Sequence, residues 1–348
     1  MRPAIPALVL TAAATLTLLS GCAGGPAFTP KPYVQQSVVR SPMTRIPAAV
    51  GPLGMLSVHP TVGHHFKGFD TCPAAGPIEY ISDFNNNVVE IFAGKFAGQA
   101  ACGQIAETLQ SPQGLFVGPN GNLYVANTGA GNILVFHRGA TTHFTTYTDP
   151  TGQYPVDVTV AHDKTVIASN LLKQDGSAAG SISTWTKSGT FVGNYPMVHD
   201  LEGLFLTVQA DGTLYYNDID ATLGQGLLWT GSCPAGVCGK FTSTGAVSVF
   251  PGGLRSAQSE AVVQVDQILL TVTTFQSFPN FTFCVIIGNG IVGPIGMDIN
   301  KSEKHLFYGD AGGVGGEIKY PTCAAIGTVP MQAGALPIGA ASDPHEPL

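Results

Sequence analysis

Hydrophobic and polar residues alternate along short segments of the chain, and turn-forming residues separate these segments. The segment 111–127 reads SPQGLFVGPNGNLYVAN, in which two alternating runs flank an Asn-Gly pair that favours a tight hairpin turn. The same frame recurs at 154–170 and at 201–217, where Asp211-Gly212 occupies the turn. Weaker copies cover 259–274 and 294–310, and a half copy at 78–83 contains only the second strand. The pattern predicts repeated pairs of short antiparallel strands.

The second strand of each copy ends at a polar residue, and these ends set the period of the repeat. They are Asp83, Asn127, Asn170, Asn217, Thr274 and Asp310, at intervals of 44, 43, 47, 57 and 36 residues. A polar or Gly-rich turn and a third strand follow, as at 133–136, and a less regular fourth strand completes the unit. A period in the forties built from short strands is typical of a β-propeller with four-stranded blades.

The two ends of the repeat region predict how the ring closes. Pro294-Ile295-Gly296 opens the last full copy, and Pro337-Ile338-Gly339 repeats this opening without a second strand after it. The half copy at 78–83 has the opposite defect, because its first strand is missing. We therefore expect the C-terminal strand to become the inner strand of a blade that begins near 78, which leaves no open edge. The prediction is an all-β, six-bladed propeller over residues 71–348.

The clearest copies resemble the NHL-repeat family of β-propellers. The resemblance rests on Pro112-Gln113-Gly114-Leu115, on the segment NGNLYVAN at 120–127 and on the ILVF that follows it, and it covers about residues 76–344. Propellers of this family serve as binding scaffolds and as enzymes. The resemblance therefore implies the fold and leaves the function open.

The composition agrees with this class and excludes several others. The 44 Gly and 25 Pro among 348 residues exclude long helices and coiled coils. Charged residues make up 11% of the chain, against about 25% in average proteins. The net charge is -7, and the 15 basic residues are scattered, so we expect no nucleic-acid partner. A hydrophobic content of 44% is enough to bury a core.

The first residues resemble a bacterial lipoprotein signal peptide. Arg2 precedes an apolar stretch at 4–18, and Leu19-Ser20-Gly21-Cys22 matches a lipobox. The resemblance implies cleavage before Cys22 and two or three acyl chains, such as palmitate, which anchor a protein stably. We expect a signal peptide at 1–21, a tether and N-terminal extension at 22–70, and a location in the bacterial cell envelope, at the outer membrane or the cell surface.

The remaining cysteines are even in number, which fits an exported protein with up to three disulfides. They are Cys72, Cys102, Cys233, Cys238, Cys284 and Cys323. Cys233 and Cys238 form the best-supported pair, because the Pro and Gly between them can turn the chain back. Six cysteines allow fifteen pairings, and closeness in the chain favours Cys72 with Cys102 and Cys284 with Cys323.

The predicted topology brings two sets of side chains to one face of the ring, the channel mouth, where inner strands start and second strands end. The strand starts offer Gln113, Asp157, Glu202, Glu260, Ile295 and Ile338. The strand ends offer Asp83, Asn127, Asn170, Asn217, Asp218 and Asp310, and His199 lies three residues before Glu202. Carboxylate and amide oxygens are ligands that suit Ca²⁺ or Mn²⁺, so a divalent cation is a candidate cofactor.

Glu202-Gly203 resembles a segment of the gluconolactonase and senescence-marker-like propellers, in which a Glu-Gly at a strand start and Asn or Asp from other blades hold a divalent metal. Glu260 takes the equivalent place but precedes Ala261, and the other segments typical of that family are missing. The structural alternative is that Asn and Asp form turns, because their side chains bond the backbone two residues on. Glu202 and Glu260 have no such role.

Two classes of function remain. The favoured one is a lipid-anchored binding scaffold for a protein, peptide or carbohydrate ligand. The alternative is a divalent-metal-dependent hydrolase or lactonase that works at the channel mouth. No catalytic residue is identified, because the sequence contains no nucleophile elbow, no phosphate-binding loop ending in Lys-Ser/Thr and no His-Glu-x-x-His.

Overall fold

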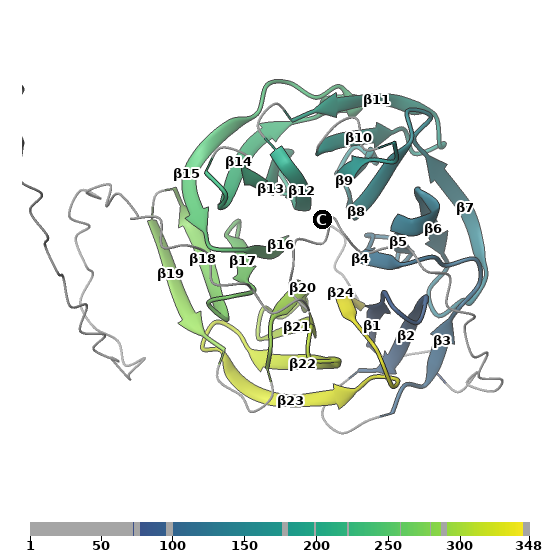
Figure 1. The fold of residues 1–348 in the computed structure, drawn as a ribbon, viewed down its shortest axis with the longest axis vertical. Coiled ribbons are helices and arrows are strands. Elements are labelled where there is room, and N and C mark those ends of the chain that lie inside the picture. Colours follow the sequence, from purple (N-terminus) through teal and green to yellow (C-terminus); the bar gives the residue numbers. More distant parts are fainter. Residues whose placement is uncertain are drawn as a thin grey trace, which may run out of the picture. The chain divides into compact units, whose positions relative to one another are not determined.

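The computed structural model describes Cys72 and the ranges 77–94, 100–175, 180–197, 200–220, 223–257, 259–278, 280–286 and 291–343. The predicted signal peptide and extension at 1–70, including Cys22, lie outside these ranges, and so does His199. In the described part, the strands form six four-stranded antiparallel sheets arranged as a ring (Figure 1). No helix among the described residues is long and apolar enough to cross a membrane.

Each sheet is one blade, and the first strand given for each is the inner one. Blade 1 contains β24 (Pro337–Asp343), β1 (Ile78–Asp83), β2 (Val88–Ala93) and β3 (Gly103–Ile105). Blade 2 contains β4 (Pro112–Val117), β5 (Leu123–Asn127), β6 (Asn132–Phe136) and β7 (His143–Thr148). Blade 3 contains β8 (Gln153–Val160), β9 (Val166–Lys173), β10 (Ser181–Trp185) and β11 (Phe191–Pro196).

The other three blades repeat this order. Blade 4 contains β12 (Asp200–Val208), β13 (Thr213–Asp220), β14 (Gly226–Ser232) and β15 (Thr242–Ser248). Blade 5 contains β16 (Pro251–Ser256), β17 (Val262–Asp266), β18 (Thr271–Ser277) and β19 (Asn280–Val285). Blade 6 contains β20 (Pro294–Ile299), β21 (His305–Asp310), β22 (Val314–Lys319) and β23 (Ala324–Pro330). The predicted six-bladed, all-β propeller is confirmed.

The ring closes as the sequence predicts. β24 pairs antiparallel with β1, with Ile78 opposite Asp343 and Tyr80 opposite Ala341 (Figure 1). All residues of both strands are buried. The last strand of the chain is therefore the inner strand of the first blade.

Blade 5 corrects the sequence-based assignment. The frame at 259–274 covers β17 and most of β18, which are the second and third strands of that blade, and Thr274 lies inside β18. The inner strand is β16, and the second strand ends at Asp266. Measured from Asn217 to Asp266 and on to Asp310, the irregular intervals of 57 and 36 residues become 49 and 44.

Glycines let several neighbouring inner strands approach one another closely at the channel. A Cβ atom on Gly296 would lie 2.3 Å from the carbonyl oxygen of Ile338 in the next inner strand. A Cβ on Gly339 would lie 2.3 Å from the carbonyl oxygen of Gln113, and one on Gly114 would lie 2.6 Å from that of Val156. No side chain fits into these spaces, so the strand packing itself requires glycine.

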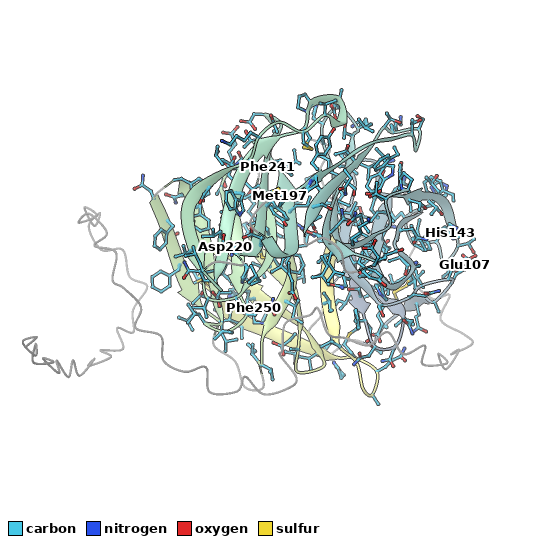
Figure 2. All side chains as sticks on the ribbon, turned by 45° about the horizontal axis from the view of Figure 1, so that its top comes forward. Glu107, His143, Met197, Asp220, Phe241 and Phe250 are labelled. Carbon is cyan, nitrogen blue, oxygen red and sulfur yellow. A yellow bond between two sulfur atoms is a disulfide. The ribbon has the colours of Figure 1, made fainter. Side chains whose placement is uncertain are left out.

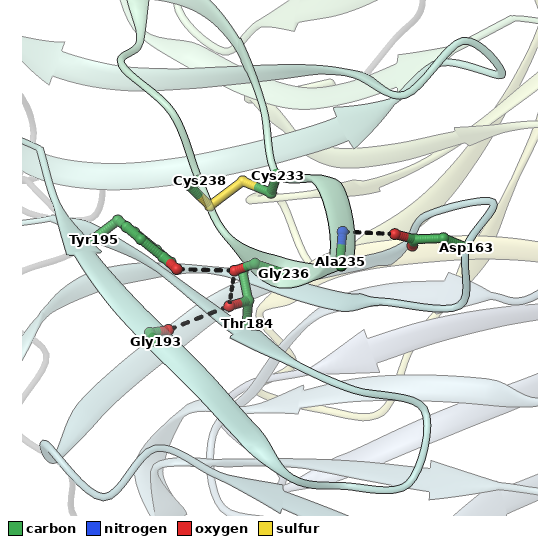
Figure 3. The surroundings of a disulfide bond; sticks show 8 residues. All are labelled: Asp163, Thr184, Gly193, Tyr195, Cys233, Ala235, Gly236 and Cys238. Atoms are coloured by element: carbon green, nitrogen blue, oxygen red, sulfur yellow. Dashed lines mark hydrogen bonds between the residues drawn. A yellow bond between two sulfur atoms is a disulfide. The ribbon is translucent and has the colours of Figure 1, made fainter.

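Three disulfides tie loops and outer strands to the ring, and they are the three pairs expected from the sequence. They join Cys72 to Cys102, Cys233 to Cys238 and Cys284 to Cys323. The loop closed by Cys233 and Cys238 docks onto blade 3 (Figure 3). The carbonyl oxygen of Gly236 accepts hydrogen bonds from Thr184 Oγ1 at 2.6 Å and from Tyr195 Oη at 3.0 Å. The loop thus joins blades 3 and 4.

Candidate functional site at the channel mouth

Each inner strand except that of blade 4 has a proline at the mouth that pairs with an Asn or Asp of the second strand. The pairs are Pro337 with Asp83, Pro112 with Asn127, Pro155 with Asn170, Pro251 with Asp266 and Pro294 with Asp310. We call these pairs the Pro–Asx rungs. Because proline has no N–H, the Asn or Asp side chain is free to accept hydrogen bonds from donors upstream of the proline.

Four of these side chains hold the loop that leads into the inner strand. Asp83 Oδ1 accepts a hydrogen bond from Leu336 N at 3.1 Å, and Asn127 Oδ1 accepts one from Gln110 N at 2.5 Å. Likewise, Asp266 Oδ2 accepts from Val249 N at 2.7 Å, and Asp310 Oδ2 accepts from Gly293 N at 3.2 Å. Burial raises the pKa of Asp83 and of Asp310, and the hydrogen bonds from N–H groups oppose that rise.

Asn170 and Asn217 lie inside their strands, and the structure gives them other partners. Asn170 Nδ2 donates to Ser181 Oγ at 3.0 Å and to Ser183 Oγ at 2.7 Å, within blade 3. Asn217 Oδ1 accepts from Phe205 N at 2.8 Å, and its Nδ2 donates to the carbonyl oxygen of Gly252 at 2.9 Å. Asn217 therefore joins blade 4 to blade 5. In the Pro–Asx rungs and at these two positions, the Asn and Asp side chains form hydrogen bonds that connect parts of the fold.

Glu260 is absent from the mouth, which corrects its predicted position. It lies in the turn between β16 and β17, at the opposite end of the inner strand, and it is exposed with φ of 61°. Its N–H donates to the carbonyl oxygen of Ala257 at 3.0 Å, and its own carbonyl oxygen accepts a hydrogen bond from Gln209 Nε2. In blade 5, Gly252 follows the proline, so this blade places no side chain at that level of the mouth.

Glu202 does lie at the mouth, in a ring of residues that occupy the same position in each inner strand. The ring consists of Gln113, Val156, Glu202, Gly252, Ile295 and Ile338. Glu202 is 5% exposed and Gln113 is 2% exposed. Gln113 Oε1 has no hydrogen-bond partner among the described residues. The mouth therefore places two buried groups with acceptor oxygens in a largely apolar ring.

Apolar side chains surround this ring on the same face. Val156, Ile295 and Ile338 belong to one buried cluster with Phe84, Leu171, Ile219 and Phe250, and the partly buried Tyr154 and Leu336 pack against it. Phe84 N donates to the carbonyl oxygen of Leu336 at 3.0 Å, which fixes this part of the rim. Several blades contribute to this buried apolar cluster, so it is a property of the assembled ring.

A second polar cluster lies in the channel toward the opposite face, and sequence analysis missed it. Asp157, expected at a strand start, lies one residue further along, where the five other inner strands have a Gly. Its Oδ2 accepts hydrogen bonds from Arg255 Nη1 at 3.1 Å and from Leu206 N at 3.3 Å. Arg255 Nη2 also donates to the carbonyl oxygen of Leu115 at 2.6 Å, and its Nε lies 3.4 Å from Asp298 Oδ1.

This cluster connects all six inner strands. Asp298 Oδ2 accepts a hydrogen bond from Ser342 N at 2.8 Å, which adds β24 to the strands that Arg255 contacts. Arg255 is 5% exposed, Asp157 is 0% exposed and Asp298 is 3% exposed. Burial raises the pKa of Asp157, and the Arg255 guanidinium opposes that rise. The cluster has the geometry of a structural hub that closes the channel.

The described residues do not provide a cluster of three His, Cys, Asp or Glu side chains arranged to hold a metal ion. Other titratable pairs lie away from the mouth. Glu107 and His143 lie at the outer edge of blade 2, with 3.7 Å between Oε2 and Nδ1 (Figure 2). His305 Nδ1 lies 2.6 Å from Glu317 Oε1. A divalent cation at the mouth remains a prediction, and Glu202 is the carboxylate of the mouth ring that could bind it.

The fold resembles several solved structures, although no protein-family model and no curated protein sequence matches the chain. A chain of the nidogen/laminin complex superimposes with a TM-score of 0.61 at 13% identity, over 77% of this chain and 98% of that chain. A catalytically inactive virginiamycin B lyase from Staphylococcus aureus with quinupristin gives 0.53 at 15% identity, over 77% and 86%. Kuenenia stuttgartiensis hydrazine synthase gives 0.50 at 14% identity, over 72% and 83%. These likenesses concern the fold alone, and the number of blades comes from the six sheets of this chain.

Proposed function

We propose that this protein is a lipid-anchored, extracytoplasmic binding module that holds its ligand at the channel mouth. The observation that supports this most directly is the ring of Val156, Ile295 and Ile338 with Gln113 and Glu202 as its two polar members. Small-molecule and peptide sites are typically apolar surfaces with a few placed polar groups. The three disulfides support export to an oxidising compartment.

The chemistry of the ring narrows the ligand class. Both polar members present acceptor oxygens, so they suit a ligand with N–H donors, and the carboxylate of Glu202 suits a protonated amine. The apolar members suit aliphatic or aromatic side chains. A peptide with a free amino terminus and apolar residues combines these features, and a carbohydrate offers less apolar surface. The NHL-like repeats are compatible with such a scaffold role.

The test uses the full chain purified in detergent and a set of tripeptides with free amino termini and Phe, Leu or Val side chains. We expect saturable binding by calorimetry, and Glu202→Gln should weaken it about tenfold or more, because a charged hydrogen bond becomes a neutral one. Glu260→Gln is the matched control, since it makes the same change in an exposed turn at the other end of the channel. No binding, or equal losses in both variants, would refute the assignment.

The lipid anchor has its own test. Cys22→Ala should abolish labelling of the protein by a fatty-acid probe in cells and should change its membrane fractionation. Unchanged labelling would refute the anchor, and it would leave the mouth unaffected as a ligand site.

The metal-dependent hydrolase remains the alternative function. Glu202 is the observation that favours it, since the carboxylate has no turn-forming role in β12. An enzyme of this kind needs a bound divalent ion, whereas a scaffold does not. Metal analysis of the purified chain separates the two classes, because one firmly bound ion per chain would favour the enzyme.

A further inference from the structure

Six of the eleven exposed large hydrophobic side chains of the described part lie in or beside blade 5. These six form what we call the blade 5 ridge, with exposed fractions between 44% and 64%. They are Val249, Ile268, Leu269, Phe281, Phe283 and Val285. Exposed hydrophobic side chains that occur singly are ordinary on a protein surface, but a contiguous group of this kind marks an interaction site.

Hydrogen bonds hold the segments that carry the ridge next to one another. The carboxylate of Asp266 accepts from the backbone N–H groups of Val249 at 2.7 Å, Ile268 at 3.0 Å and Leu269 at 2.8 Å. Ile286 N donates to the carbonyl oxygen of Leu270 at 2.7 Å, so the end of β19 lies beside the turn between β17 and β18. β19, which carries the other three residues, runs along the outer rim of the ring (Figure 1).

β19 is an outermost strand, and its sequence lacks the usual protection of an edge. It pairs with β18 on one side and is the last strand of its sheet among the described residues. Phe281, Phe283 and Val285 alternate with Asn280, Thr282 and Cys284, so one face of this edge strand is apolar. The outer strands β7 and β15 instead read HFTTYT and TSTGAVS, which are mainly polar. An exposed apolar edge strand is a template for pairing with another strand.

Contacts within the protein hold β19 in place. Cys284 forms a disulfide with Cys323, which lies in the turn between β22 and β23 of blade 6. On the apolar face of β19, the ring of Phe281 lies 6.0 Å from that of Phe275, its buried cross-strand partner in β18. A strand held in this way loses little conformational freedom on binding, which favours association.

The charge around the ridge favours a second copy of the same chain as the partner. The net charge of -7 makes two copies repel each other over most of their surfaces. Between 251 and 285, however, the ionisable acidic and basic side chains are Arg255, Glu260 and Asp266, and the first and last of these are buried. Blade 5 therefore presents a nearly uncharged surface on which two copies can meet.

We propose that the protein forms a two-fold symmetric dimer through antiparallel pairing of two β19 strands. A two-fold interface must be self-complementary. Pairing centred on Phe283 places it opposite Phe283 of the partner subunit, and it places Phe281 opposite Val285 of the partner subunit. All three cross-strand pairs are apolar, and they lie on the same face of the joined sheet. The F-x-F-x-V pattern of β19 is thus symmetric in the way that this pairing requires.

The test is the oligomeric state of the full chain, measured by sedimentation velocity in density-matched detergent. The wild type should sediment as a dimer. Phe283→Lys should sediment as a monomer, because it places two like charges directly opposite each other across the axis. Phe144→Lys is the matched control, since Phe144 is 47% exposed on the outer strand β7 of blade 2, and this variant should remain dimeric.

Thermal unfolding distinguishes loss of the dimer from loss of the fold. Phe283 is 64% exposed, so Phe283→Lys should retain a cooperative unfolding transition with a native circular-dichroism spectrum. A monomeric wild type, or a Phe283→Lys variant that stays dimeric, would overturn the proposal. If the wild type is monomeric, binding to phosphatidylglycerol vesicles shows what the ridge contacts instead. Weaker vesicle binding by Phe283→Lys would mean that the ridge contacts a bilayer, and the dimer would be refuted. These outcomes do not depend on the ligand at the mouth.

Discussion

Replacing Arg255 tests whether the buried hub holds the ring together. Arg255→Met keeps an unbranched, apolar stem but leaves Asp157 and Asp298, both buried, without their shared cation. Breaking a buried ion pair by removing one partner costs about 3–5 kcal/mol. A domain of ordinary stability has about 5–15 kcal/mol in total, so the variant should lose a large fraction of its free energy of unfolding.

The measurement is urea unfolding of the full chain at neutral pH, followed by the fluorescence of Trp185, which is 2% exposed. Lys173→Met is the control. That lysine is 34% exposed and pairs with the exposed Asp175, so its loss should cost about 1 kcal/mol or less. The double variant Arg255→Met, Asp157→Asn should regain at least about 1 kcal/mol over Arg255→Met, because one uncompensated charge is gone.

The pH dependence gives an independent check. Burial raises the pKa of Asp157 above that of the unfolded chain, and Arg255 opposes the rise, so in Arg255→Met the pKa should rise further. The protonated form carries no charge, so the deficit of the variant should shrink as the pH falls and grow as the pH rises through the folded pKa. A loss below about 1 kcal/mol, or a deficit independent of pH, would refute the role of Arg255 as a hub.

Three further predictions concern the clasp, the interior of blade 1 and the mouth. Deleting 334–348 removes β24, whose residues are all buried, and should lower the free energy of unfolding by more than about 4 kcal/mol. A melting temperature within a degree or two of that of the wild type would contradict the observed closure of the ring. Burial raises the pKa of Glu90 to about 7, so stability should fall as the pH rises through that value, by on the order of 3 kcal/mol, and Glu90→Gln should flatten this dependence in melts across the range. If Glu202 binds a divalent ion, Ca²⁺ or Mn²⁺ should stabilise the wild type by about 2.7 kcal/mol at a hundredfold excess over Kd. The Glu202→Gln variant should not show this stabilisation. Superimposable melting curves with chelator, Ca²⁺ and Mn²⁺ would exclude a bound metal ion.

The sequence predicted the blades whose turns have a local signal. Asn120-Gly121 and Asp211-Gly212 mark tight turns between alternating strands, so blades 2 and 4 were recognisable from short segments. β16 was missed because Gly252 and Gly253 resemble a loop. They are glycines because Cβ atoms there would lie 2.5 Å from the carbonyl oxygen of Ile295 and 2.4 Å from the N atom of Met297. The recurring Pro-x-Gly opening, shared by Pro251 and Pro294, is the signal that could have located this strand.

The polar groups were harder to predict because their partners are distant in the chain. Arg255 and Asp157 are 98 residues apart, and only the closed ring brings them together across the channel. The Asn and Asp residues at the mouth were visible in the sequence, but their hydrogen bonds to incoming loops were not. The one local clue to the hub was an Asp at a position where the five other inner strands carry Gly.

Because β24 pairs with β1, the ring does not depend on which blade comes first in the chain. Ile78 and Asp343 are direct cross-strand partners, so their Cα atoms are separated by only about 5 Å. A short linker could join these two points, and the chain could be opened instead in a turn between two other blades. Circular permutants of this kind should build the same ring from a different starting blade, which would make the propeller a scaffold whose termini can be moved to the face where a fused domain is wanted.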